Sequence, residues 1–281
     1  MQTKAPLPGK CHHINRSIYR ITAPNSGLMT GPGTNTYIIG DKKFLIIDPG
    51  PDIPEHIKNI LNYTNGDIDL ILATHTHLDH SPAAKILKKA TGASIAGRIP
   101  PHLPNQDITF MPDFELKDGD TVTIEDTVLQ VIRTPGHASN HICLYDAVHY
   151  CLFSGDHIIE GSSVVIDPPD GDMKSYLNSM KKIETYDMKY IAPAHGGIID
   201  NPYDAIKQII NHRLKREEKI IECLRIHPKI ELLELVKYAY DDVNTGVHFL
   251  AERSLLAHLL KLKKENIVIM DENKWRLVLL E

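Results

Sequence analysis

Hydrophobic positions over the first two thirds of the chain fall into short apolar runs and longer amphipathic stretches. Runs rich in β-branched residues predict buried strands, and an apolar period of about 3.6 residues predicts helices. We expect strands at 17–23, 36–40, 43–48, 68–74 and 188–194, and helices at 54–64, 81–91 and 172–186. Their alternation implies a sheet covered by helices, so the fold class is α/β.

Between residues 107 and 153 the pattern changes to short strands separated by turn signals. The turns are predicted at 117–120 and around Glu125, and the strands include 128–133, 141–145 and 149–154. Successive short strands with such turns indicate a meander.

The last third predicts a different unit. A long helix at 202–226, with Leu214 among its inward positions, ends before Pro228. Helices at 230–240 and 248–264 and a hairpin at 267–280 complete the order of a winged helix. We therefore divide the chain into a catalytic domain, 1–215, and a winged-helix-like C-terminal domain, 216–281.

Charge is unevenly distributed along the 281 residues, of which 42% are apolar and 24% charged. Residues 207–264 hold 12 Lys and Arg against 8 Asp and Glu, whereas the whole chain has a net charge of −5. The basic stretch is either a solvated helical surface or a face for a partner. If the partner is RNA, the phosphate contacts would come from the outer face of the 248–264 helix, at Arg253, Lys261, Lys263 and Lys264.

Targeting signals and paired cysteines are both lacking in the sequence. No apolar run approaches the roughly 18 residues that span a bilayer, and the N-terminal stretch has no apolar core of a signal peptide. The four cysteines form no CxxC pair, which fits a reducing compartment. We expect a cytoplasmic protein without a membrane partner.

The densest chemistry lies in THTHLDH at 74–80, directly after a predicted buried strand. Ligand sites of open α/β sheets lie at such strand ends. Imidazole and carboxylate side chains together suit zinc, and also manganese or iron. The ligand-type residues in this stretch are His75, His77, Asp79 and His80.

Three further ligand-type residues follow other predicted strands. His137, Asp156 and His195 each stand beside a glycine on a strand-exit turn, where glycine permits the backbone to aim a side chain at a site. Together with the first cluster they make seven ligands, enough for two metal ions with one bridge and open positions for water.

This constellation resembles the metallo-β-lactamase superfamily, whose HxHxDH pattern is matched at 75–80 and whose later ligands are matched in order by His137, Asp156 and His195. The resemblance covers about residues 15–200 and implies an αββα sandwich. By that match, His75, His77 and His137 would hold one metal ion, and Asp79, His80 and His195 the other. Asp156 would bridge the two ions, which we expect to be zinc, with manganese or iron as alternatives.

Within this superfamily, the chain resembles the β-lactamase-like protein 2 group. The matching features are the segment 33–37, the segment 153–156, the helix carrying His212, Arg213, Arg216 and Glu217, and the C-terminal winged helix. That group includes an endoribonuclease acting on single-stranded RNA, and related folds include glyoxalase II thioesterases.

The resemblance implies a hydrolase that uses a hydroxide held at a dinuclear centre, with Asp79 able to accept a proton from the water. Our first expectation for the substrate is single-stranded RNA. The alternatives are a glyoxalase II-like thioesterase (a hydroxyacylglutathione hydrolase), or another small ester hydrolase. A mononuclear iron persulfide dioxygenase and a non-catalytic nucleic-acid binder also stay open.

Residues beside the ligands have predicted supporting roles. His141 follows His137 by four residues and could orient a ligand through its second ring nitrogen, or simply pack in the core. Asn35 could line the pocket or cap a turn. Winged helices also serve as dimer interfaces, so a homodimer remains open.

Overall fold

The computed structural model describes residues 6–278, which form two compact units. The first unit contains the chain up to Thr134, with Asn140–Ser162 and Glu184–Pro202. The second contains Pro135–Ser139, Ser163–Ile183 and the chain from Tyr203 onward. The predicted domain division between residues 215 and 216 falls inside a helix of the second unit and stays a prediction.

The first unit is built on two β-sheets. The seven-stranded sheet has the order β1-β2-β3-β4-β5-β6-β7, and the five-stranded sheet has the order β12-β11-β10-β9-β8. The strands of the first sheet are β1 (Cys11–Asn15), β2 (Ile18–Thr22), β3 (Asn35–Ile39), β4 (Phe44–Ile47), β5 (Ile68–Leu72), β6 (Ser94–Gly97) and β7 (Phe114–Glu115). Those of the second are β8 (Thr121–Ile124), β9 (Thr127–Arg133), β10 (Ile142–Asp146), β11 (Cys151–Gly155) and β12 (Tyr190–Pro193).

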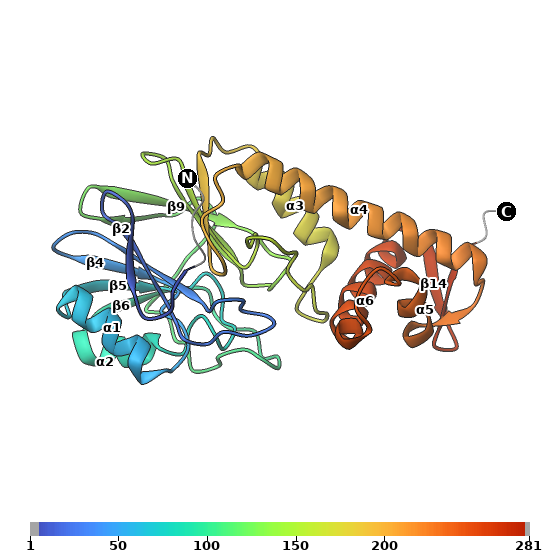
Figure 1. Cartoon of the computed structure of the whole chain (residues 1–281), viewed down its shortest axis with the longest axis horizontal. Helices are drawn as coiled ribbons and strands as arrows, with labels where there is room; N and C mark the ends of the chain where they lie inside the picture. The colour runs from blue at the N-terminus through green and yellow to red at the C-terminus, as the bar shows by residue number, and fades with distance from the viewer. Residues whose placement is uncertain (1–5, 279–281) are drawn as a thin grey trace. The chain divides into compact units, whose positions relative to one another are not determined.

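Two hydrophobic layers hold this unit together. Side chains from one face of the first sheet, such as Tyr37 and Leu45, pack against Val131 and Phe153 of the second sheet. The opposite face of the first sheet is covered by α1 (Pro54–Thr64) and α2 (Ala84–Thr91), as Figure 1 shows. This order of layers follows from strands with apolar residues on both faces, which require cover on each side.

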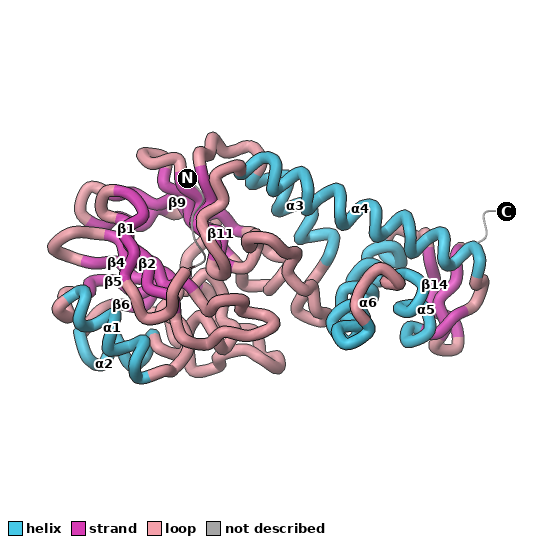
Figure 2. The backbone as a smooth tube through the Cα atoms, viewed as in Figure 1, coloured by secondary structure: helices cyan, strands magenta, loops and turns pink. Residues whose placement is uncertain are grey.

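The second unit joins helices to a small sheet. Its helices are α3 (Met173–Ile183), α4 (Pro202–Ile226), α5 (Leu232–Ala239) and α6 (His248–Lys264), with a short 3-10 helix at Thr245–Val247. Its strands are β13 (Ile230–Glu231), β14 (Val268–Asp271) and β15 (Lys274–Leu277), in the order β13-β15-β14. In Figure 2 the hairpin of β14 and β15 lies beside α5. Residues of α4, α5, α6 and the hairpin share one apolar core that includes Leu235, Leu255 and Trp275.

One prediction about this unit is wrong. Leu214 is 41% exposed, whereas its neighbours Arg213 and Arg216 are buried on α4. The ammonium of Lys261, one of the proposed phosphate contacts, lies 2.7 Å from Glu217 and 2.9 Å from Glu265.

Two more of the proposed phosphate contacts have intramolecular partners. Lys264 lies 2.5 Å from the carboxylate of Asp172, and Arg253 lies 3.1 Å from that of Asp167. Each pair has no net charge, so the basic stretch offers less positive potential to a polyanion than the sequence count implies.

Candidate metal centre

The loop that follows β5 carries the first four predicted ligands. β4 and β5 run parallel, so their carboxyl ends meet at one edge of the sheet. There the carboxylate of Asp48 accepts hydrogen bonds from Thr74 N–H, at 2.7 Å, and from the Thr74 hydroxyl, at 2.9 Å. These bonds fix the start of the loop, and His75 and His80 after it are fully buried.

Donor atoms from three loops meet at this edge. One group comprises His75, His80 and Asp156, and another comprises Asp79, His80 and His195. Within each group the potential ligand atoms lie within 4.8 Å of one another. The loops after β5, β11 and β12 thus bring together residues that are up to 120 positions apart in the chain.

The carboxylates contact both neighbouring imidazoles. His80 Nε2 lies 3.4 Å from Asp79 Oδ2 and 3.5 Å from Asp156 Oδ1. His195 Nε2 lies 3.3 Å and 3.2 Å from the same two oxygens. His75 Nε2 lies 2.9 Å from His77 Nδ1. This arrangement leaves the bridging role of Asp156 and the division of ligands between two ions as predictions.

His137 belongs to the second unit, in the short loop Pro135–Ser139. Its Nδ1 lies 2.9 Å from the carbonyl oxygen of Val165. Because a carbonyl can only accept, Nδ1 carries the proton and Nε2 is the nitrogen with a lone pair. The assignment of His137 to the first metal ion stays a prediction.

Burial and charge shift the pKa values of these groups strongly. Burial opposes the charge on His195, but the carboxylates of Asp156 and Asp79 outweigh it and raise the pKa of His195 to about 10. His80 is likewise buried, and its pKa is raised by Asp79, Asp156 and Asp48. For Asp156 and Asp79, burial is outweighed by the imidazoles, and the pKa of each carboxyl is lowered. Burial lowers the pKa of His75, so that imidazole is neutral.

The donor set fits divalent metal ions. Imidazoles and ionised carboxylates are ligands of zinc, and a metal ion would bind in place of the protons that Asp79 and Asp156 favour on His80 and His195. A metal-binding histidine usually donates a hydrogen bond from its other ring nitrogen to a carboxylate or carbonyl. Asp48 is in place to accept it, because its Oδ2 lies 3.0 Å from His80 Nδ1. A carboxylate on the far ring nitrogen fixes the tautomer that presents Nε2 to a metal ion.

The two predicted supporting residues lie beside the ligands. Nε2 of His141 accepts a hydrogen bond from the Asp156 backbone N–H, at 3.2 Å, and its Nδ1 lies 2.8 Å from the Thr134 hydroxyl. Asn35 is fully buried and does not line an open pocket; its amide donates to the carbonyls of Pro193 and Gly196, both at 2.9 Å. Asn35 thereby holds the turn that carries His195.

Sequence reasoning missed Asp48. It follows β4 immediately before Pro49 and Gly50 and has a positive φ of 51°. An acidic residue at the end of an all-apolar strand is the signal in the sequence that could have indicated it. In the structure the positive φ points the same way, since backbone strain of this kind concentrates at functional sites.

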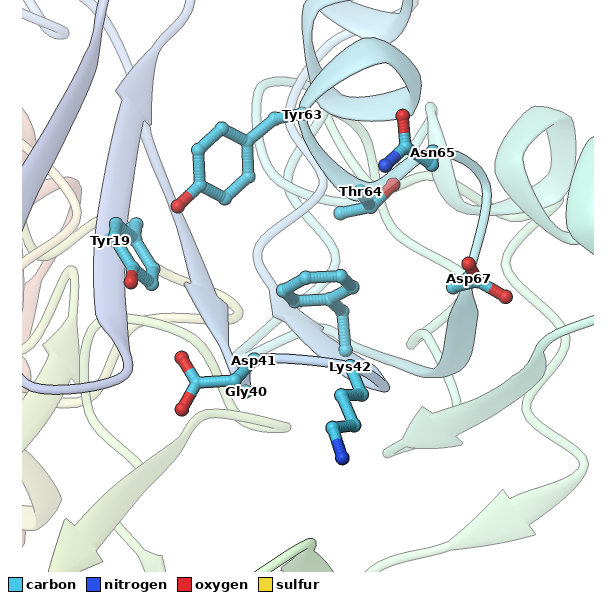
Figure 3. A pocket seen from close by; sticks show the side chains of 9 residues that line it. Tyr19, Gly40, Asp41, Lys42, Tyr63, Thr64, Asn65 and Asp67 are labelled. Carbon is cyan, nitrogen blue, oxygen red and sulfur yellow. The ribbon is translucent and has the colours of Figure 1, made fainter.

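A hollow of about 460 Å³ in the first unit lies away from these donors. Figure 3 shows its lining, which includes Tyr19, Tyr63, Asp41 and Gly40. Gly40 follows the last residue of β3, whereas Asn35, at the start of β3, contacts the turn of His195. The hollow is therefore at the opposite strand end.

Comparison with known proteins identifies the family of the chain. The metallo-β-lactamase superfamily model matches residues 29–195, which contain all seven predicted ligands. The chain belongs to the metallo-β-lactamase superfamily. The model of the β-lactamase-associated winged helix domain matches residues 232–275. The predicted fold class and the predicted enzyme class, a metal-dependent hydrolase of this superfamily, are confirmed.

Individual relatives extend the match over nearly the whole chain. A β-lactamase-like protein 2 homolog from Caenorhabditis elegans is 31% identical over 267 residues, which cover 91% of this chain and 87% of the relative. This confirms the predicted group. An atrochrysone carboxyl ACP thioesterase from Aspergillus novofumigatus is 27% identical over 274 residues, covering 92% of this chain and 82% of that protein.

A solved structure supports the fold. The crystal structure of a β-lactamase domain protein from Burkholderia ambifaria has a TM-score of 0.83 at 17% identity and covers 99% of this chain and 96% of its own. Between residues 6 and 278, no helix combines the length and hydrophobicity needed to cross a membrane.

Proposed function

We propose that the chain hydrolyses a thioester of a small or carrier-bound acyl group at a dinuclear metal centre. The observation that carries the proposal is the convergence of Asp79, His80, His195 and Asp156 at one strand edge, with donor atoms within 4.8 Å in each group. Two divalent ions bound there would supply an activated water and would neutralise charge that develops on the substrate oxygen.

Asp79 is the residue we assign to proton transfer. Its side chain is 29% exposed, against 12% for Asp156, so it can face an entering water and substrate. The imidazoles of His80 and His195 hold its pKa below the usual range, although burial acts in the opposite direction. The carboxylate is thus ionised at neutral pH. Because the lowered pKa makes it a weak base, the assignment rests on its exposed position beside His80 and His195.

In thioester hydrolysis, water oxygen would attack the carbonyl carbon and the C–S bond would break, giving an acid and a thiol. His195 is held for this reaction by Asn35 and by Gly33, whose carbonyl lies 3.2 Å from His195 Nδ1. The bond to Gly33 places the proton on Nδ1 and leaves Nε2 toward Asp79 and Asp156.

Two observations favour a thioester over a polyanion. The cations expected to grip phosphates, Arg253, Lys261 and Lys264, are paired with carboxylates of the same unit. A relative that aligns with 92% of the chain is named as an acyl carrier protein thioesterase.

Single-stranded RNA is the second candidate. It is favoured by the winged helix match at residues 232–275 and by the likeness to a β-lactamase-like protein 2 homolog. The same pair of ions would clamp a phosphodiester, so the metal centre serves either reaction.

Zinc is the ion we propose, because imidazole and carboxylate ligands in a buried site suit it.

The cytoplasm is the compartment we propose. The four cysteines, Cys11, Cys143, Cys151 and Cys223, are all free thiols, which a reducing compartment maintains.

An activity panel tests the proposal. The purified chain is assayed with S-lactoylglutathione, with an acyl thioester of a longer chain and with a single-stranded RNA, each with and without a chelator. We expect chelator-sensitive thioester turnover that Asp79→Asn removes. Cleavage of RNA with no thioester turnover would contradict the proposal in favour of the endonuclease.

A further inference from the structure

Two neighbouring carbonyls in the segment Ser163–Asp167 accept hydrogen bonds from two distant side chains. The carbonyl of Val165 accepts from His137 Nδ1, at 2.9 Å. The carbonyl of Val164 accepts from the guanidinium of Arg213 on α4. A single peptide unit therefore lies between a predicted metal ligand and a buried cation.

Arg213 is buried to an unusual degree for a charged side chain, with 4% exposure. Its guanidinium carbon lies 5.5 Å from the ring centroid of Tyr176, and its Nε has no hydrogen-bond partner among the described residues. Burial of a charge is costly unless it is compensated. The compensation visible here is the Val164 carbonyl and the face of the Tyr176 ring.

The loop that carries His137 is also fastened to α3. Gly136 has a φ of +144°, and a Cβ there would meet Tyr176 Cα at 2.3 Å. The Gly136 carbonyl accepts from Asp172 N–H at 2.9 Å, and the Ser179 hydroxyl donates to the Pro135 carbonyl at 2.8 Å. With the loop held on this side, the Val165 carbonyl sets the ring orientation of His137.

We propose that Arg213 is a positioning residue for His137. By holding the Val164 carbonyl, it fixes the adjoining peptide so that the Val165 carbonyl receives Nδ1–H and Nε2 is presented as the metal donor. The inference rests on the proposed function, because it takes His137 as a ligand of one ion. It gives the α4 helix a role in metal binding.

A matched control lies one turn further along α4. Arg216 is also buried, at 7% exposure, and stacks on Tyr240 with 4.1 Å from its guanidinium carbon to the ring centroid. Its hydrogen bonds go to the Ala239 carbonyl and to both carboxylate oxygens of Asp242. None of these hydrogen bonds reaches the segment Ser163–Asp167, so loss of Arg216 should perturb the same helix without moving His137.

The experiment measures Zn²⁺ affinity by competition with a chelating indicator, in the full chain. We compare Arg213→Met, Arg216→Met, His137→Ala and the double variant Arg213→Met with His137→Ala. Loss of a residue that orients a metal ligand weakens binding about 10- to 100-fold. We expect this loss at one of two zinc ions in Arg213→Met and no loss in Arg216→Met. In the His137→Ala background, Arg213→Met should have no further effect.

Arg213→Lys provides the second variant. It keeps a charge and a donor for the Val164 carbonyl, so its Zn²⁺ affinity should fall less than tenfold. If Arg213→Met does not fold, the comparison with and without His137→Ala is made with Arg213→Lys. Equal losses in the two arginine variants, or an additive loss with His137→Ala, would overturn the proposal. A His137→Ala variant that keeps both ions would instead contradict the metal assignment on which the proposed function rests.

Discussion

The carboxylate of Asp48 lies 3.0 Å from Nδ1 of His80, although 32 positions separate the two residues in the chain. The same carboxylate fixes the backbone and the hydroxyl of Thr74. One buried group thus sets both the start of the ligand loop and the tautomer of its last histidine.

Asp48→Asn should therefore weaken metal binding. The amide would direct N–H groups toward Thr74 or His80 donors, which misplaces the imidazole. We expect about a 10- to 100-fold loss of affinity for one ion, measured by competition with a chelating indicator.

The matched control for Asp48→Asn is Asp146→Asn. Asp146 is also fully buried; it accepts from the backbone of Val148 and His149 and lies 2.5 Å from His149 Nδ1, in the turn between β10 and β11. Each substitution should cost about 1–3 kcal/mol of folding free energy. Equal metal affinities in the two variants would refute the role of Asp48.

Asp79→Asn should reduce turnover far more than stability. The amide cannot accept the proton from the attacking water, and losses of about two to four orders of magnitude are typical for such groups. Asp69→Asn is the control, because Asp69 is exposed and, within residues 6–278, forms an ion pair with Lys43 alone, at 3.4 Å. Steady-state kinetics measures the loss of turnover, and thermal unfolding measures the loss of stability. Wild-type turnover in Asp79→Asn would make Asp79 a structural residue.

Acid should destabilise the second unit through His258. Burial lowers the pKa of His258 to about 4, against 6.5 in an unfolded chain, and Arg213 and Lys261 act in the same direction while Glu217 opposes them. Between these values the unfolded chain binds more protons, so stability falls as pH drops from about 6.5 to 4, by about 3 kcal/mol.

The single tryptophan reports this transition. Trp275 is buried in the core of the second unit, so its fluorescence follows unfolding of that unit. In His258→Gln the denaturant midpoint should change less across this pH range than it does in the wild type. A pH dependence that is unchanged in His258→Gln would exclude His258 as its source.

The sequence was sufficient for most of the elements and for the local ligand cluster. Apolar runs located β4, β5 and β12, and the motif at 75–80 by itself contains four residues of two ligand types, His and Asp. β1 was missed because its five residues, CHHIN, lack an apolar alternation, and β6 was missed because SIAG is short and built mainly of small residues.

Long-range contacts account for what the sequence left out. Asp48 reaches Thr74 and His80 because β4 and β5 are parallel neighbours, and no local sequence pattern predicts that pairing. On α4 an apolar period places Leu214 inward, yet Arg213 and Arg216 occupy the buried face because carbonyls, an aromatic ring and Asp242 receive them. Glu217, which pairs with Lys261, and Asp172, which pairs with Lys264, likewise come from distant segments, whereas Glu265 follows Lys261 by four positions.

Metal content of the chain tests the central claim most directly. Protein purified without added metal is analysed for all transition metals and for protein concentration in the same sample. The donor set of His75, His77, Asp79, His80, His137, Asp156 and His195 predicts about two divalent ions per chain, chiefly zinc. A fully active preparation with a single iron and no second metal would contradict the dinuclear hydrolase.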